Sequence, residues 1–265
     1  MNSPPVVLSI AGSDSSSCSG MQADLKTFAA LGVFGLSTIT AVTAQNTFTT
    51  KNWNSLPETL IEQQLQTVTE DISPLATKTG MLANANIVKL VARLSKKDQL
   101  GLLVVDPVLS SSSGKSLCHS CKDGYLENLF PLAEVITPNI VEASLLTDKK
   151  ITSLQDMIQA GKDLSQTGCK TVIIKGGHFL ANSGSSVDVI YSKDSYRLLF
   201  SPRISTNNTR GTGCTFSAAI CAFLAKGLET FEAIKEAKLY LNTTLVGAKH
   251  WELGQGPGPL DHLRF

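Results

Sequence analysis

The segment Gly211-Thr212-Gly213-Cys214 places a thiol where two glycines lead into an apolar stretch. Glycine lets the backbone approach a ligand closely, and the first N–H groups of a helix have no partner within that helix. These groups and the helix dipole together favour an anion. No Gly-Lys-Ser/Thr follows, so the segment is not a P-loop. The spacing predicts an anion site suited to a phosphoryl group in transfer, with Gly211, Gly213 and Cys214 at its catalytic centre.

The chemistry of Cys214 has three interpretations. A thiol at a helix N-terminus has a lowered pKa, so we expect a thiolate that accepts a proton from a substrate hydroxyl. A small buried thiol is the alternative, because burial is the commonest fate of free cysteine. A covalent nucleophile is the third, and it requires a histidine partner. The four histidines, at positions 119, 178, 250 and 262, form no obvious Cys–His motif.

Strand-like and helix-like segments alternate along the chain. Strands are predicted at residues 6–11, 36–42, 102–105, 135–136 and 171–174, with a hairpin at 187–191 and 196–200. Helices are predicted at residues 21–31, 57–71, 84–94, 139–146, 154–164, 213–228 and 231–248. This alternation predicts an α/β fold with a mainly parallel sheet covered on both faces. Because no domain boundary or repeat is visible, we expect one domain over residues 1–265.

Polar residues gather where the strands of this sheet are expected to end. They are Ser13-Asp14, Gln45-Asn46, Lys78, Asp106, Asn139 and Lys175. In parallel sheets ligands bind at the carboxyl ends of the strands. The pattern therefore indicates an enzyme whose site lies along one edge of the sheet.

The charge balance argues against a polymeric or membrane partner. The 265 residues include 23 Lys and Arg and 22 Asp and Glu, a net charge of +1. No basic stripe or acidic tail points to nucleic acid or a membrane surface. No apolar stretch reaches the roughly 18 residues that span a bilayer. MNSPPVVLSIAGSD lacks a basic region before its apolar run, which predicts a first strand rather than a signal peptide, and hence a cytoplasmic protein.

Six cysteines are expected to be reduced thiols in such a compartment. Cys118 and Cys121 form a lone CxxC motif. Structural zinc would need a second pair of ligands, and none is visible. We interpret this stretch as the start of a surface helix.

Six blocks lie in register from about residue 6 to residue 262. They are IAGSD…GMQADLKTFAALGV…ITAVTAQNT, KTGML, VVDPVLSSSSG, VITPN…EA, VIIKGGH and GTGCTFSAAI. Together they resemble the hydroxymethylpyrimidine kinase and phosphomethylpyrimidine kinase family of thiamine biosynthesis, a branch of the ribokinase-like superfamily. In the broader superfamily an aspartate usually stands at the position of Cys214, so the cysteine argues against a sugar kinase.

The resemblance implies a ribokinase-like three-layer α/β/α sandwich. It implies ATP-dependent phosphorylation of 4-amino-5-hydroxymethyl-2-methylpyrimidine, and then of its monophosphate to the diphosphate, with Mg²⁺. It also implies a homodimer. A pyridoxal or pyridoxine kinase of the same fold is the first alternative, and a non-catalytic sensor that keeps the pocket without phosphoryl transfer is another.

Matched positions imply two groups of binding residues. The pyrimidine would lie against Asp24, Gln45, Met81, Val108 and Ser19. ATP would lie against Asp106, Asn139, Glu142, Lys175 and Thr212, with Asp106 and Glu142 as the oxygen ligands that organise Mg²⁺. Without the resemblance, five of these residues have a structural alternative. Asp24 reads as a helix-surface charge, Asp106 as a loop cap and Lys175 as a solvated lysine, whereas Met81 and Val108 read as core residues.

The chain departs from the family pattern at two places. Ser17 and Cys18 stand where glycines are usual, and Ser19 stands where alanine is usual. Side chains here would narrow the pyrimidine site or add hydroxyl groups. Arg210 stands where histidine is usual, and we hypothesise that it favours the charged monophosphate. The alternative for Arg210 is a solvent-facing charge.

Overall fold

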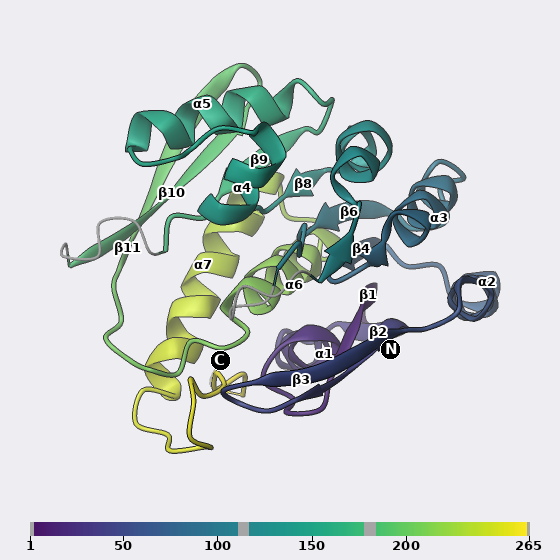
Figure 1. Cartoon of the computed structure of the whole chain (residues 1–265), viewed down its shortest axis with the longest axis horizontal. Coiled ribbons are helices and arrows are strands. Elements are labelled where there is room, and N and C mark those ends of the chain that lie inside the picture. The colour runs from purple at the N-terminus through teal and green to yellow at the C-terminus, as the bar shows by residue number, and fades with distance from the viewer. Residues whose placement is uncertain (1–2, 111–116, 178–183, 264–265) are drawn as a thin grey trace.

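The computed structural model describes residues 3–110, 117–177 and 184–263 (Figure 1). Its main sheet has nine strands in the order β11-β10-β9-β8-β6-β4-β1-β2-β3. These strands are β1 (Val6–Asp14), β2 (Phe34–Gln45), β3 (Thr50–Ser55), β4 (Ala76–Thr79), β6 (Leu102–Val105), β8 (Val135–Ile136), β9 (Thr171–Ile174), β10 (Ser185–Ser192) and β11 (Ser195–Pro202). A second sheet pairs β5 (Ala83–Asn84) with β7 (Cys118–His119).

The six strands from β2 to β9 in the sheet order run parallel, and β3 and β10 are antiparallel to their neighbours. Strand β1 lies between β2 and β4, where Val7 is in register with Gly35 on one side and Ala76 on the other. Parallel strands bring their carboxyl ends to one edge of the sheet. That edge is where the sequence places its polar residues.

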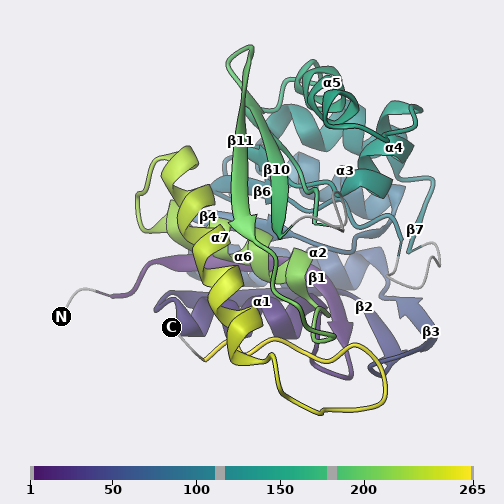
Figure 2. The same ribbon diagram turned by 90° about the vertical axis from the view of Figure 1, so that its left-hand side faces the viewer.

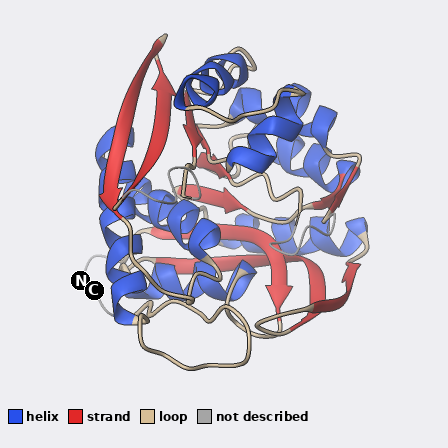
Figure 3. Ribbon diagram, turned by 60° about the vertical axis from the view of Figure 1, so that its left-hand side comes forward, coloured by secondary structure: helices blue, strands red, loops and turns tan. Residues whose placement is uncertain are grey.

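Helices cover both faces of the sheet, as Figures 2 and 3 show. They are α1 (Gly20–Ala30), α2 (Glu58–Asp71), α3 (Ala85–Ser95), α4 (Ile140–Thr147), α5 (Leu154–Ser165), α6 (Thr212–Ala225) and α7 (Thr230–Gly247), with a π-helix at Gly124–Leu129 and a 3-10 helix at Phe130–Leu132. The core on one face includes Phe28, Phe216 and Tyr240 from α1, α6 and α7. The core on the other face includes Leu65 and Met157 from α2 and α5. The predicted three-layer α/β/α sandwich with a mostly parallel sheet is confirmed.

Helix α6 lies deep inside one of these layers. Every residue from Thr215 to its last residue, Ala225, is buried. A helix that is apolar on all sides is stable only when it is surrounded, and α6 packs against α1, α7, β1, β4 and β6. Its N-terminus is therefore held rigidly beside the strand ends.

Two strands of the main sheet escape prediction from the sequence. Strand β3 reads Thr-Lys-Asn-Trp-Asn-Ser and forms the sheet edge, where polar residues are tolerated. Strand β4 reads Ala-Thr-Lys-Thr and is fully buried despite its polar sequence. Neither has the apolar run that marks a strand.

The prediction for Cys118 and Cys121 is wrong. The two residues form a disulfide, and Cys118 lies in β7 rather than at a helix start. Both are buried, because β7 pairs with β5 over the core. The other four cysteines are free, as expected. Among the helices of the described ranges, none has both the length and the apolar character that crossing a bilayer requires.

Candidate active site

The start of α6 is shaped by a glycine in the left-handed region. Gly211 caps the helix with φ of 90°, and a Cβ on it would lie 2.1 Å from the carbonyl oxygen of Cys18. Only glycine satisfies both constraints. The loop before α1 therefore packs directly on the start of α6. The N–H of Gly20, the first residue of α1, hydrogen-bonds the thiol of Cys214, so two helix N-termini meet at this sulfur.

Unpaired donors are present at this helix start. In the described part of the chain, the N–H groups of Gly213 and Cys214 have no acceptor, whereas Thr212 donates its N–H to the carbonyl of Thr209 at 3.4 Å. A Cβ on Gly213 would lie 3.3 Å from Nζ of Lys175 and 3.7 Å from Oδ2 of Asp106. Because Gly213 has no side chain, Lys175 at the end of β9 and Asp106 at the end of β6 can lie close to the positive end of the α6 dipole.

Asp106, which is buried, and Lys175, which is mostly buried, form an ion pair at the ends of these strands. Lys175 Nζ lies 2.8 Å from Asp106 Oδ1, which also accepts a hydrogen bond from Thr137 at 3.1 Å. Burial would raise the pKa of Asp106, but Lys175 and Lys78 outweigh it and hold the pKa below its usual range. Asp106 is therefore an ionised carboxylate. Lys175 is not the solvated lysine of the alternative interpretation.

Asn139 and Glu142 form a capping box at the start of α4. The Asn139 side chain accepts from the N–H of Glu142 at 2.9 Å, and Oε2 of Glu142 accepts from the N–H of Asn139 at 2.8 Å. A β-bridge joins Asn139 to Lys175. Burial raises the pKa of Glu142 to about 7, because the repulsion of Asp106 adds to it and Lys175 compensates only in part.

These residues fit a divalent cation bound together with nucleotide phosphates. Within the described ranges, no donor reaches Oδ2 of Asp106 or Oε1 of Glu142. Mg²⁺ is commonly held by one or two carboxylates plus substrate phosphates. Among the described residues no group of three or more His, Cys, Asp or Glu could hold a metal alone, and the two carboxylates suit a cation that arrives with its nucleotide.

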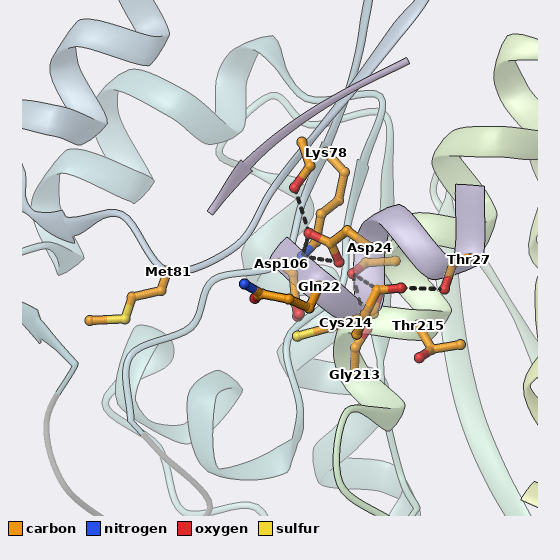
Figure 4. A network of polar contacts seen from close by, with 12 residues as sticks. Gln22, Asp24, Thr27, Lys78, Met81, Asp106, Gly213, Cys214 and Thr215 are labelled. Carbon is orange, nitrogen blue, oxygen red and sulfur yellow. Dashed lines mark hydrogen bonds and ion pairs between the residues drawn. The ribbon is translucent and has the colours of Figure 1, made fainter. Parts of the chain in front are cut away.

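Lys78 is a site residue to which the sequence assigned no role. Its Nζ lies 2.8 and 2.9 Å from the two carboxylate oxygens of Asp24, and both side chains are fully buried (Figure 4). Ser9 donates a 2.6 Å hydrogen bond to the same carboxylate. Burial alone would lower the pKa of Lys78, but Asp24, Cys214 and Asp106 hold it above the usual range. The signal in the sequence is a lysine inside a short buried strand.

The position of Asp24 overturns one of its two interpretations. It is not a helix-surface charge, because it is completely buried. Its two oxygens are engaged by Lys78 and Ser9. Asp24 therefore holds the ammonium group of Lys78, which in turn acts on the pKa of Cys214. The contact of Asp24 with the pyrimidine stays a prediction.

The predicted lowering of the Cys214 pKa is wrong. Burial, together with the carboxylates of Asp24 and Asp106, raises the pKa of this thiol to about 11. Lys78 and the N–H of Gly20 lower the pKa but do not compensate. The thiol is therefore protonated at neutral pH in the free protein. In Figure 4 its sulfur points away from Thr215, toward the side on which Met81 lies.

Four of the expected pyrimidine-binding residues lie at or after the ends of β1, β2, β4 and β6. Gln45 Nε2 donates to Ser19 Oγ at 3.3 Å. Met81 is buried, and its sulfur lies 3.2 Å from where a Cβ on Gly12 would stand. Val108 is partly buried and donates its N–H to the carbonyl of Asp106 at 2.9 Å. The Gly211–Cys18 contact connects this group to the start of α6.

The two departures from the family pattern have definite structures. Ser17 adopts a left-handed φ of 58°, the conformation that glycine favours, and donates its N–H to Asp14. Cys18 is buried. Arg210 donates to the carbonyl of Thr47 at 3.1 Å, and no partner in the described ranges reaches its buried Nε. Arg210 thus joins the β2–β3 turn to the loop before α6.

A covalent cysteine nucleophile has no support from the described residues. The groups that act on Cys214 are Lys78, Asp24, Asp106 and Gly20, with no imidazole among them. His262 instead hydrogen-bonds Thr215 at 2.9 Å. His178 lies outside the described residues.

Comparison with known proteins places this site in a family. Residues 14–261 match the family model described as phosphomethylpyrimidine kinase. The hydroxymethylpyrimidine/phosphomethylpyrimidine kinase of Haemophilus influenzae is 44% identical, over 100% of this chain and 99% of that protein. The thiamine biosynthesis bifunctional protein ThiED of Geobacter sulfurreducens is 41% identical over 97% of this chain.

This chain spans about half the length of the bifunctional relatives that it matches, 52% in the case of the Geobacter protein. Among solved structures, the pyridoxal kinase of Staphylococcus aureus in complex with AMP-PCP and pyridoxal is similar, with a TM-score of 0.90 at 34% identity. That similarity covers 100% of this chain and 95% of the kinase.

Proposed function

This chain belongs to the phosphomethylpyrimidine kinase family, and we propose from this that it is a hydroxymethylpyrimidine/phosphomethylpyrimidine kinase of thiamine biosynthesis. It would transfer the γ-phosphoryl group of ATP to the hydroxymethyl group of 4-amino-5-hydroxymethyl-2-methylpyrimidine, and then a second phosphoryl group to the monophosphate. One observation carries the proposal: the unpaired N–H groups of Gly213 and Cys214 lie beside Asp106 and Lys175 at the carboxyl ends of the parallel strands.

The nucleotide side is supported by charge. Lys175, whose pKa is raised by Asp106 and Glu142 although burial opposes the shift, stays cationic beside the start of α6. A fixed cation and helix N–H groups stabilise the charge that develops on a phosphoryl group in flight. Asp106 and Glu142 would hold Mg²⁺, which supplies charge neutralisation on the phosphates. Asn139 and Thr212 complete the proposed ATP site.

The transfer itself requires one bond to form and one to break. The hydroxymethyl oxygen of the substrate bonds to the γ-phosphorus, while the bond from that phosphorus to the bridging oxygen breaks and ADP leaves. The hydroxyl proton must pass to an acceptor, for which we propose Cys214. Because burial keeps this thiol protonated at neutral pH, only its deprotonated fraction accepts the proton, and turnover should rise with pH.

The substrate side is proposed from matched positions. Gln45, Met81, Val108 and Ser19 would surround the pyrimidine. Asp24 would contribute through Lys78, with which it is paired. Arg210 remains our hypothesis for the preference between the pyrimidine and its monophosphate. Arg210→Ala should impair the second phosphorylation more than the first, and equal losses would contradict that role.

Pyridoxal phosphorylation is the second candidate activity. The similarity to a solved pyridoxal kinase favours it, because pyridoxal also carries a hydroxymethyl group on a heteroaromatic ring. The family model is described as phosphomethylpyrimidine kinase, and two relatives that match over at least 97% of both chains are named as hydroxymethylpyrimidine/phosphomethylpyrimidine kinases. We therefore rank the pyrimidine first.

Several further properties belong to the proposal. We expect one kinase domain over residues 1–265, a homodimer, Mg²⁺ dependence and a cytoplasmic protein. The decisive experiment incubates the chain with Mg²⁺, ATP and the hydroxymethylpyrimidine and identifies products by mass spectrometry. Mono- and diphosphates with matching ADP release are expected. ATP turnover without a phosphorylated pyrimidine would refute the proposed function.

A further inference from the structure

We propose that Asp14, acting through the hydroxyl of Ser19, fixes the orientation of the Gln45 amide so that it selects an aminopyrimidine edge and rejects the corresponding oxo edge. Ser19 is then a positioning residue for specificity. The inference rests on the proposed function, in which Gln45 faces the pyrimidine. The argument follows the direction of each hydrogen bond from Asp14 to Thr50.

Asp14 accepts four hydrogen bonds. Its Oδ1 accepts from the N–H of Ser16 at 2.9 Å and the hydroxyl of Ser16 at 2.8 Å. Its Oδ2 accepts from the N–H of Ser19 at 2.9 Å and the hydroxyl of Ser19 at 2.7 Å. A carboxylate has about four lone-pair sites and no donor once ionised. The Asp14 side chain is thus a saturated acceptor, and the Ser19 hydroxyl must donate to it.

This direction leaves the Ser19 oxygen with only an accepting role. A serine hydroxyl has a single hydrogen, and Asp14 takes it. The Gln45 amide atom that lies 3.3 Å from Ser19 Oγ must therefore be the nitrogen, Nε2, which donates to it. At the other end, Thr50 donates its hydroxyl to Oε1 of Gln45 at 2.7 Å, and Thr50 is buried. Reversing the amide would bring Oε1 against Ser19 Oγ, which has no hydrogen left to donate, so this hydrogen bond would be lost even if the Thr50 hydroxyl turned round to accept.

The backbone of Gln45 is held as well. Ser15 Oγ lies 2.7 Å from its carbonyl oxygen and 2.9 Å from its nitrogen. With both ends of the side chain and the backbone fixed, one N–H and one carbonyl lone pair of Gln45 remain for a ligand. They come in a fixed order, with the donor on the side of Ser19 and the acceptor on the side of Thr50.

The fixed order selects a chemical edge. The amino group of 4-amino-5-hydroxymethyl-2-methylpyrimidine is a donor, and the adjacent ring nitrogen is an acceptor, so this edge complements a single amide orientation. The 4-oxo analogue, 5-hydroxymethyl-2-methylpyrimidin-4(3H)-one, carries a ring N–H and a carbonyl and needs the reversed amide. A site whose buried polar groups are mismatched to a ligand rejects it strongly.

The test compares kcat/KM for the amino and oxo compounds in Ser19→Ala. Without the hydroxyl, Asp14 no longer dictates the amide orientation, because Thr50 can either donate or accept. We expect kcat/KM for the amino compound to fall about three- to tenfold, mainly through a higher KM, because this is the effect of losing one hydrogen bond. The oxo compound should gain, so that the amino/oxo ratio falls on the order of tenfold or more.

Ser16→Ala is the matched control, since it removes a hydroxyl from the same carboxylate without touching Gln45. Its ratio should equal that of the wild type. An unchanged ratio in Ser19→Ala, or an equal change in both variants, would overturn the inference while leaving the kinase activity established. A wild-type protein that phosphorylates neither compound would overturn the proposed function and the inference with it.

Discussion

Lys78 and Asp24 form an ion pair in which neither side chain has any exposed surface, and Nζ lies 2.8 Å from Oδ2. The pair joins β4 to α1 close to the thiol of Cys214, on whose pKa both charges act (Figure 4). Removing two charges from water is costly, and their attraction offsets the cost only while both partners are present. The pair is therefore sensitive to the loss of either residue.

Loss of one partner should destabilise the fold strongly. Lys78→Met or Asp24→Leu leaves an uncompensated buried charge, and we expect each to lower the free energy of unfolding by about 3–5 kcal/mol. The double variant should lose clearly less than the sum of the two, because no charge remains unpaired. Urea unfolding measures all three. Losses that simply add would show that the two residues are not coupled.

Cys214 should control the pH dependence of turnover. The burial that raises its pKa to about 11 makes the thiolate fraction grow tenfold per pH unit below that value. In wild type, kcat should rise between pH 7 and pH 9 with a slope near one. Cys214→Ser should lower kcat about a hundredfold, flatten the profile and leave nucleotide affinity nearly unchanged.

Cys221→Ala, on the same helix, is the control for this experiment, because that thiol is buried and the proposed mechanism does not use it. It should keep the wild-type slope. If Cys214→Ser turns over normally at every pH, the thiol is not the proton acceptor.

Asp106 should set the requirement for Mg²⁺. Asp106→Asn replaces a carboxylate ligand by an amide and also weakens the hold on Lys175. We expect the Mg²⁺ concentration for half-maximal activity to rise at least about tenfold. Glu134→Gln removes an acid next to the amino end of β8, away from the site, and should not change it. If both variants reach half-maximal activity at the same Mg²⁺ concentration, Asp106 is not a ligand of the metal.

His262 should make stability depend on pH. Burial and the nearby Lys26 lower its pKa to about 4 from 6.5. The unfolded chain therefore binds a proton that the folded chain does not between these values, so stability is full above about pH 6.5 and is lost as pH falls toward 4. This one group should contribute a loss of about 2 kcal/mol between pH 7 and pH 5.

His262→Gln keeps a hydrogen-bonding group toward Thr215 but does not titrate. Chemical unfolding at pH 7 and pH 5 should show a smaller loss in this variant than in wild type. An equal loss in both proteins would mean that His262 does not carry the pH dependence.

Much of the fold is predictable because local pattern and tertiary packing agree. The strands at Leu102–Val105 and Thr171–Ile174 are apolar runs, and they are buried. The start of α6 is marked by Gly211 and Gly213. Strand β4 could not be predicted, since two of its buried polar residues find their partners in distant segments: Thr77 donates to the carbonyl of Leu100, and Lys78 pairs with Asp24.

The chemistry of the site was harder to predict than its location. The sequence places Cys214 at a helix N-terminus, which alone lowers a thiol pKa. The burial and the carboxylates of Asp24 and Asp106 that reverse this shift come from segments far away in the chain. The disulfide joins two cysteines only three residues apart, and it was missed because reduced thiols were expected.

The most direct test of the central claim measures ATP-dependent kcat/KM on the hydroxymethylpyrimidine and on pyridoxal in parallel. We predict that the pyrimidine is preferred at least about tenfold, with monophosphate and then diphosphate as products. A preference for pyridoxal, or no phosphorylation of the pyrimidine at saturating ATP and Mg²⁺, would contradict the account.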